Sequence, residues 1–170
     1  MADVPELQGE SVRLRPLGLA DVERLTKIGA EPEVARWWGE ITRESLRKKA
    51  EGRDNATAFA IELDEELIGL AEFSETDEPD FNAANIDLYL TTSAHGRGLG
   101  RDTVRTLARW LVSERGHHRL TIDPAADNEP AIRCYEAVGF KRVGILRRYW
   151  RDPRGEWRDG LLLDLLAEEL

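Results

Sequence analysis

The stretch from Ile86 to Gly100 reads IDLYLTTSAHGRGLG and combines a strand pattern, a glycine-rich turn and a helix start. Apolar Ile86, Leu88 and Leu90 stand at every second position, which is the period of a β-strand. After Gly100 the apolar positions follow the spacing of one helix face: Val104, Leu107, Ala108, Leu111 and Val112. The stretch therefore predicts a strand that turns directly into a helix.

The turn holds three glycines, Gly96, Gly98 and Gly100. Glycine allows positive φ and lets backbone N–H groups come close to a ligand. A helix N-terminus adds unpaired N–H donors and a partial positive charge. Together these features suit a pyrophosphate. The alternative is a turn whose glycines only let the helix and the strand pack closely.

Two common phosphate-binding loops do not fit this turn. The nucleotide P-loop requires a lysine followed by serine or threonine after its glycines, and neither pair follows here. The dinucleotide fingerprint requires a third glycine where Arg101 stands. The spacing that remains is Gly-x-Gly-x-Gly on a strand-to-helix turn.

Two separated motifs resemble the GCN5-related N-acetyltransferase (GNAT) superfamily. The family pattern Gln/Arg-x-x-Gly-x-Gly/Ala is met by His95, Gly96, Arg97, Gly98, Leu99 and Gly100, with His95 in place of Gln or Arg. The pattern Asn-x-x-Ala-x-x-x-Tyr-x-x-x-Gly-Phe is met by Asn128, Ala131, Tyr135, Gly139 and Phe140. The resemblance extends from Val12 to Leu166.

The resemblance implies an α/β fold of the GNAT type, with a central mixed, mostly antiparallel sheet flanked by helices. The 170 residues fit one domain, 1–170. Strands are expected at 11–17, 57–63, 67–74, 119–123, 141–150 and 156–166, and helices at 19–29, 42–51 and 128–138. Glu31-Pro32 should break the first helix, and the acidic loop Glu75–Asp80 should end the strand before it. Asp152–Gly155 fits a type I turn.

Composition limits the function classes. A net charge of −9 argues against nucleic acid as a partner. The chain has no apolar stretch of membrane-spanning length and no basic-then-apolar leader, so a cytoplasmic protein without a membrane partner is expected. Cys134 is the single cysteine and histidines number three, so neither an internal disulfide nor a metal site is expected. A monomer and a homodimer both remain open.

The resemblance implies acetyl-CoA (coenzyme A) as the cofactor. The strand backbone at Leu88, Tyr89 and Leu90 would pair with the pantetheine arm, and one of its N–H groups would polarise the thioester carbonyl. The pyrophosphate would lie on the turn, at His95, Gly96, Arg97, Gly98, Leu99, Gly100 and Arg101. Asn128 would contact pantetheine, or would serve only as a helix N-cap.

Tyr135 is the candidate general acid, because a phenol with a pKa of about 10 is protonated at pH 7. The alternative is a tyrosine that only fills the core. Neighbouring Cys134 has no histidine evidently placed to activate it, and is interpreted as a small buried residue.

The general base is left open between Asp87 and Glu72, which could also bind a cationic amine or be solvated strand residues. Asp123 is a third acidic candidate for the acceptor site. Trp37 and Trp38 would form a wall of that site or belong to the core, and one of them should be exposed because adjacent residues cannot share a helix face.

These residues predict an N-acetyltransferase that moves an acetyl group to a primary amine by direct attack. Trp37-Trp38-Gly39, Asp87 and Asp123 are similar to the aminoglycoside 6′-N-acetyltransferases, so the acceptor would be an aminoglycoside 6′-amine or another small cationic amine. One alternative is a protein N-terminus, because the ending with Tyr149, Trp150 and Trp157 looks like the ribosomal-protein alanine acetyltransferases. The other is a non-catalytic acyl-CoA-binding or sensing domain. Acetyl and longer acyl donors remain open.

Overall fold

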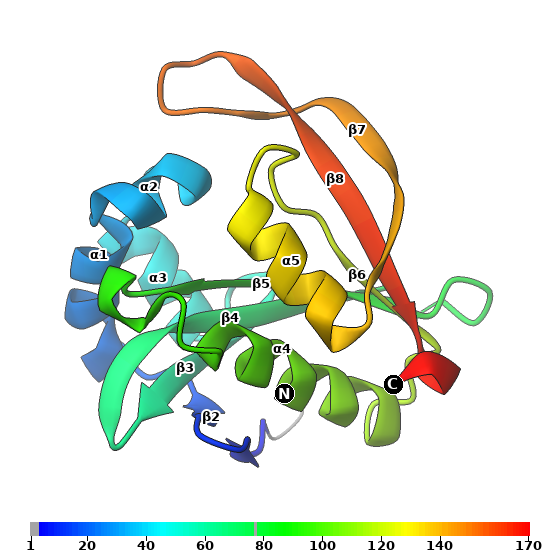
Figure 1. The fold of residues 1–170 in the computed structure, drawn as a ribbon. Helices are drawn as coiled ribbons and strands as arrows, with labels where there is room; N and C mark the ends of the chain where they lie inside the picture. Colours follow the sequence, from blue (N-terminus) through cyan, green and yellow to red (C-terminus); the bar gives the residue numbers. More distant parts are fainter. Residues whose placement is uncertain (1–3, 77) are drawn as a thin grey trace.

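A mixed sheet of eight strands in the order β1-β2-β3-β4-β5-β6-β8-β7 runs through the computed structural model, which describes residues 4–76 and 78–170 (Figure 1). Neighbouring strands are antiparallel except β5 and β6, which are parallel. The strands are β1 Leu7–Gln8, β2 Arg13–Pro16, β3 Thr57–Leu63, β4 Glu66–Thr76, β5 Ala83–Leu90, β6 Arg119–Ile122, β7 Lys141–Arg151 and β8 Trp157–Leu166. The expected mixed, mostly antiparallel sheet is confirmed.

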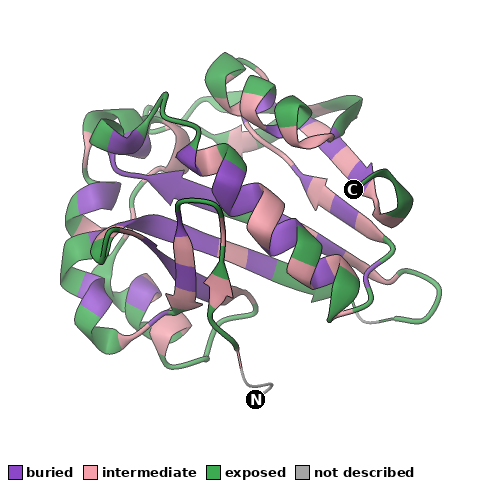
Figure 2. Ribbon diagram, turned by 60° about the horizontal axis from the view of Figure 1, so that its bottom comes forward, coloured by how far each residue is buried: buried purple, intermediate pink, exposed green. Residues whose placement is uncertain are grey.

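Helices cover both faces of the sheet, and the buried residues lie along the strands and the inner sides of the helices (Figure 2). The helices are α1 Val22–Gly29, α2 Pro32–Trp38, α3 Arg43–Ala50, α4 Leu99–Ser113 and α5 Glu129–Val138. Leu88 and Leu90 pack in the core cluster shared with α4 and α5, whereas Tyr89 packs in the cluster shared with α1, α2 and α3. Strand alternation thus sends neighbouring side chains of β5 to opposite faces.

Strands β5 and β6 separate after a short stretch of pairing. The register joins Ala83–Asn85 to Arg119–Thr121. Strand β6 ends at Ile122, whereas β5 continues to Leu90. The C-terminal half of β5 therefore faces a gap in the sheet, and its backbone groups on that side can bind something other than a strand.

Strand β4 is longer than the sequence predicted. The prediction that Glu75–Asp80 does not continue the strand is wrong at its start, because Glu75 and Thr76 pair with Ala84 and Ala83 of β5. The carboxylate of Glu75 accepts hydrogen bonds from Arg115 and lies 2.7 Å from Nε2 of His117, which compensates its charge. Asp77, in the same predicted loop, lies outside the described residues.

Helix α2 was not predicted. Pro32 ends α1 as expected, but it also occupies the first turn of α2, where its missing N–H costs nothing. Val34 of this helix is buried against α1 and α3 in the second core cluster. The helix ends at Gly39, which has φ 69°. None of the helices in the described ranges is long and apolar enough to cross a bilayer.

Asp102, in the first turn of α4, ties this helix to the residues just before β2. Its buried carboxylate accepts backbone N–H bonds from Glu10 (3.0 Å), Ser11 (2.8 Å) and Val12 (2.9 Å). Burial opposes ionisation of this group, but the three N–H donors outweigh it and lower the pKa of Asp102.

We expect Asp102→Ala to lower the free energy of unfolding by ~3 kcal/mol at pH 7, because three buried donors lose their acceptor. Urea denaturation measures this loss, with Asp80→Ala at an exposed position as the control. A group with a lowered folded-state pKa stabilises the protein above its unfolded pKa and loses that effect in acid. The difference between wild type and variant should therefore shrink below pH 4, and a loss no larger than that of Asp80→Ala would contradict this account.

Candidate active site

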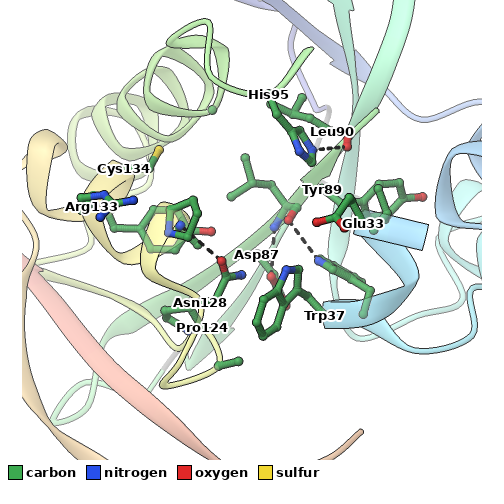
Figure 3. Close-up of a pocket in the computed structure, with 18 of the residues that line it drawn as sticks. Glu33, Trp37, Asp87, Tyr89, Leu90, His95, Pro124, Asn128, Arg133 and Cys134 are labelled. Atoms are coloured by element: carbon green, nitrogen blue, oxygen red, sulfur yellow. Dashed lines mark hydrogen bonds between the residues drawn. The ribbon is translucent and has the colours of Figure 1, made fainter. Parts of the chain in front are cut away.

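A cavity of about 840 Å³ opens where β5 and β6 separate (Figure 3). Glu33 and Trp37 of α2 lie on one side of it, Asn128, Arg133 and Cys134 lie on the other, and Asp87 of β5 lies between them (Figure 3). Every residue predicted for the coenzyme or the acceptor lines this cavity except Arg97 and Glu72: Trp37, Trp38, Asp87, Leu88, Tyr89, Leu90, His95, Gly96, Gly98, Leu99, Gly100, Arg101, Asp123, Asn128 and Tyr135.

The glycine turn presents bare backbone to the cavity. Gly98 precedes α4 in the left-handed conformation, with φ 76°. A Cβ built there would meet no described atom within 4 Å, so a side chain would project into open space. The first-turn N–H groups of α4 have no acceptor within the helix. Gly100 has another role, because a Cβ there would lie 3.4 Å from Sγ of Cys134 on α5. The turn therefore leaves open backbone at Gly98 that fits the predicted anion site, and at Gly100 it lies close to α5 and to Leu90 of β5.

The backbone of β5 that faces the gap is bonded to side chains. The carbonyl of Leu88 accepts the indole N–H of Trp38 at 3.1 Å, and the N–H of Leu88 donates to Oδ1 of Asp87 at 3.0 Å. The carbonyl of Leu90 lies 2.9 Å from Nε2 of His95 (Figure 3). These main-chain groups lie on the side of β5 that has no strand partner there, and an extended amide chain could pair with them as an added strand does if it displaced the side chains that now hold them. The residues therefore fit the pantetheine arm as well as the pyrophosphate.

Asp87 lies at the base of the cavity. Asp87 is exposed to the solvent of the cavity, and the protein atoms packed around its carboxyl group partly desolvate it. Burial raises its pKa to about 8, with further contributions from the charges of Glu72 and Asp123, while the N–H of Leu88 and the charge of Lys49 act in the opposite direction. A carboxyl group with this pKa can exchange a proton with an amine near neutral pH.

Asp123 approaches the same space from the end of β6. Its Oδ2 accepts the amide of Asn85 at 2.9 Å. Burial raises the pKa of Asp123, and hydrogen bonds from Asn85 and Tyr149 limit that rise. The sequence did not assign Tyr149 to this carboxylate, because no local spacing relates β7 to the end of β6.

Glu72 lies beside the cavity, and its carboxylate is held by an ion pair. In the β4–β5 register it stands directly opposite Asp87. Its Oε2 lies 2.7 Å from Nζ of Lys49 on α3, and both side chains are mostly buried. The sequence predicted a helix at 42–51 but assigned no residue of it to the site, so it did not identify Lys49 as a neighbour of the site.

Tyr135 and Asn128 come from α5. The side chain of Asn128 accepts the N–H of Ala131 at 3.4 Å, which confirms the predicted N-cap. Tyr135 is buried at the cavity wall, with its ring edge-on to Phe140 at a centroid distance of 6.5 Å. Burial, followed by the charge of Asp87, raises the pKa of Tyr135 well above 10, so its hydroxyl is protonated at neutral pH.

Both tryptophans of α2 are half-buried, so the prediction that one of them is exposed is wrong. Trp38 turns inward, edge-on to Tyr89 at a centroid distance of 5.0 Å. Trp37 carries the guanidinium of Arg36 over its ring at 4.5 Å, which covers it. Cys134 is half-buried at the opposite wall, and burial raises the pKa of its thiol to about 11, so it is not a ready nucleophile.

Comparisons with known proteins agree with this geometry. A family model described as "Acetyltransferase (GNAT) domain" matches residues 11–141, and the chain belongs to this family of acetyltransferases. It is 29% identical over 155 residues to the aminoglycoside N(6′)-acetyltransferase type 1 of Klebsiella pneumoniae, covering 81% of this chain and 77% of the relative. The predicted superfamily is thereby confirmed.

Two solved structures are similar over almost the whole chain. The aminoglycoside acetyltransferase AAC(6′)-Ib in complex with coenzyme A has a TM-score of 0.78 and 26% identity, covering 94% of this chain and 96% of that one. The ribosomal-protein-S5-alanine acetyltransferase of Vibrio fischeri has a TM-score of 0.82 and 19% identity, covering 98% of each chain, and this likeness concerns the fold alone. The protein is an acetyltransferase whose acetyl donor is acetyl-CoA.

Proposed function

We propose that this enzyme acetylates a primary amine on a small molecule that carries further positive charge, such as the 6′-amine of an aminoglycoside. The observation that supports this acceptor is the pair of carboxyl groups, Asp87 and Asp123, that line the cavity from β5 and from the end of β6. Glu33 adds a third acidic side chain from α2. A cation entering this space would be attracted by each of these carboxyl groups that is ionised, which for Asp87 requires a pH near 8 or above, and the net charge of −9 favours its approach.

Acetyl-CoA supplies the acetyl group as a thioester. In the proposed mechanism Asp87 accepts the proton that the bound ammonium group loses, which frees the nitrogen lone pair to form the C–N bond. A backbone N–H of β5 between Leu88 and Leu90 polarises the carbonyl. Tyr135 donates its hydroxyl proton to the sulfur as the C–S bond breaks. The nitrogen, now bonded to the acetyl carbon, releases its second proton to solvent, and Tyr135 regains a proton from solvent. Asp123 holds a positive charge of the acceptor.

A protein N-terminus is the second candidate acceptor. Tyr149 and Trp150 of β7 line the cavity, so aromatic side chains as well as carboxyl groups face an incoming substrate. Such a wall suits the backbone and apolar side chains of a peptide. The two candidates differ in charge, since a peptide N-terminus carries one positive charge and an aminoglycoside carries several.

Thiol release from acetyl-CoA, followed with a panel of amines, separates the candidates. The panel contains a kanamycin-type aminoglycoside, a linear polyamine and a short peptide with an N-terminal alanine. We expect the polycations to give the highest kcat/KM, and Asp123→Asn to lower it for them more than for the peptide. A preference for the peptide would favour the second candidate, and coenzyme binding without turnover on any amine would favour a sensing domain.

For Tyr135→Phe we expect kcat to fall by ~10²-fold while the Kd for coenzyme A stays within a factor of about three, because the variant loses only the proton donor. Steady-state kinetics and titration calorimetry measure the two quantities. The melting temperature checks that the buried ring still packs on Phe140. An unchanged kcat would remove Tyr135 from the role of general acid.

A further inference from the structure

Lys49 is a charged side chain next to the site that the proposed reaction does not use. Its helix, α3, is otherwise polar and mostly exposed, with Leu46 as its fully buried residue. Neighbouring Lys48 follows that pattern and forms an exposed pair with Glu44. The Lys49 side chain instead points inward and is only 16% exposed. A charged lysine that is mostly buried requires a partner of opposite charge, so the carboxylates around Lys49 indicate which groups its charge affects.

Two carboxylates hold the ammonium group of Lys49 in place. Its Nζ lies 2.7 Å from Oε2 of Glu72 and 3.4 Å from Oδ1 of Asp54. Asp54 is itself fixed, because the same Oδ1 accepts the N–H of Ala56 at 2.9 Å. The Glu72 side chain is 13% exposed, so its pair with Lys49 is little screened by solvent. The ammonium group of Lys49 thus lies between two carboxylates, Asp54 and Glu72, and Glu72 is the one that stands opposite Asp87.

Glu72 and Asp87 are cross-strand partners in the β4–β5 register. Side chains directly opposite each other in an antiparallel pair lie on the same face with Cβ atoms about 5 Å apart, and like charges there repel. Without a counter-charge, ionised Glu72 would oppose the ionisation of Asp87. Lys49 supplies that counter-charge.

We propose that Lys49 is a positioning residue for acetyl transfer, which withdraws Glu72 into an ion pair and thereby leaves Asp87 as the general base. The proposal rests on the proposed function, in which Asp87 takes the proton of the amine. It also favours Asp87 in the choice between the two carboxylates that the sequence left open, because Asp87 lines the cavity, whereas Glu72 does not and has its Oε2 paired with Lys49 at 2.7 Å.

The groups that act on Asp87 come from every element around it. They are Glu72 of β4, Asp123 after β6, Lys49 of α3, Tyr135 of α5, Tyr149 of β7 and the N–H of Leu88. Lys49 carries the positive charge in this set. Replacing it with a neutral residue leaves Glu72 uncompensated, so the Glu72–Asp87 pair should hold a proton to higher pH.

The test compares Lys49→Met with Lys48→Met, which removes the exposed neighbouring lysine. Carbon-13 carboxyl titration of the free protein follows Asp87 and Glu72, with Asp87→Asn and Glu72→Gln providing the assignments. For Lys49→Met we expect the upper apparent pKa of the pair to rise by about one unit. Lys48→Met and Lys49→Arg should leave it near the wild-type value. Glu72→Gln should lower the apparent pKa of Asp87 by a similar amount. In the double variant Lys49→Met/Glu72→Gln this pKa should return toward the wild-type value.

The pH profile of kcat/KM with one acceptor is the second readout, since a lysine that only stabilises the fold would lower activity at all pH values without moving the profile. We expect the acid limb to move with the carboxyl titration in each variant. An unchanged carboxyl pKa in Lys49→Met, or in Glu72→Gln if the lysine variant does not fold, would overturn the role of Lys49. A carboxyl pKa that moves while the acid limb stays fixed would instead contradict Asp87 as the base, and with it the positioning role. Acetylation of the amine is tested separately by the thiol-release assay, so a failure of the positioning role and a failure of the proposed function can be told apart.

Discussion

Asp87→Asn is expected to lower kcat/KM for the amine by ~10²- to 10⁴-fold, because it removes the general base and keeps the shape of the side chain. The wild-type enzyme should gain activity as pH rises through about 8, where Asp87 loses its proton. The pH profile of kcat/KM of the variant should lack this rise, and should change with pH only as the acceptor amine itself ionises. Binding of coenzyme A should change little, since the proposed pyrophosphate turn begins at His95, beyond the end of β5 at Leu90.

The stability of the same variant gives an independent check. The folded-state pKa of Asp87 is raised from its ordinary value near 4 to about 8. Between these two pH values the folded protein therefore keeps a proton on Asp87 that the unfolded chain has already lost. Stability therefore decreases as pH rises across this window, and Asp87→Asn should be more stable than wild type, by a margin that grows toward pH 8. Asp80→Asn, at an exposed position, should show neither effect. A fully active Asp87→Asn enzyme would contradict the assignment of the base.

Gly98→Val is expected to weaken binding of coenzyme A by at least ~10²-fold. A side chain at this position would project into the open space before α4 that the pyrophosphate is proposed to fill. A side chain at positive φ also costs ~1–2 kcal/mol of backbone strain, which must be separated from the effect on the ligand.

Gly116→Val is the matched control, because Gly116 has φ 74° and a Cβ there would also meet no described atom within 4 Å. Gly116 follows α4, and among the residues that the structure describes it is not one of those that line the cavity. The control should lose stability by a comparable amount and still bind coenzyme A normally. Equal affinities of the two variants, measured by calorimetry, would show that the turn does not form the pyrophosphate cradle.

The sequence predicted the parts of the site that depend on local patterns. Alternation in β5, the glycine spacing after it and the period of α4 all act within fifteen residues, so their geometry follows from neighbours along the chain. The same holds for Asn128, whose capping contact lies three residues away at Ala131. These elements lie where the sequence placed them.

The features that the sequence missed depend on contacts distant in the chain. Lys49 looks like its exposed neighbour Lys48 until α3 packs beside β4, and only the β4–β5 register places Glu72 against Asp87. Tyr149 reaches Asp123 because β8 carries β7 to that side of the split sheet. The cytoplasmic location, the oligomeric state, the extent of the domain and the length of the acyl group stay predictions.

Carboxyl titration of Asp87 in the free wild-type protein tests the central claim most directly, because the proposed mechanism depends on a carboxyl group that the site makes basic enough to deprotonate an amine. Carbon-13 labelled aspartate, assigned with Asp87→Asn, reports that single ionisation without a substrate. The account expects a midpoint near pH 8, produced by burial and by the charges of Glu72 and Asp123. A midpoint near pH 4, as for an ordinary solvated aspartate, would contradict it.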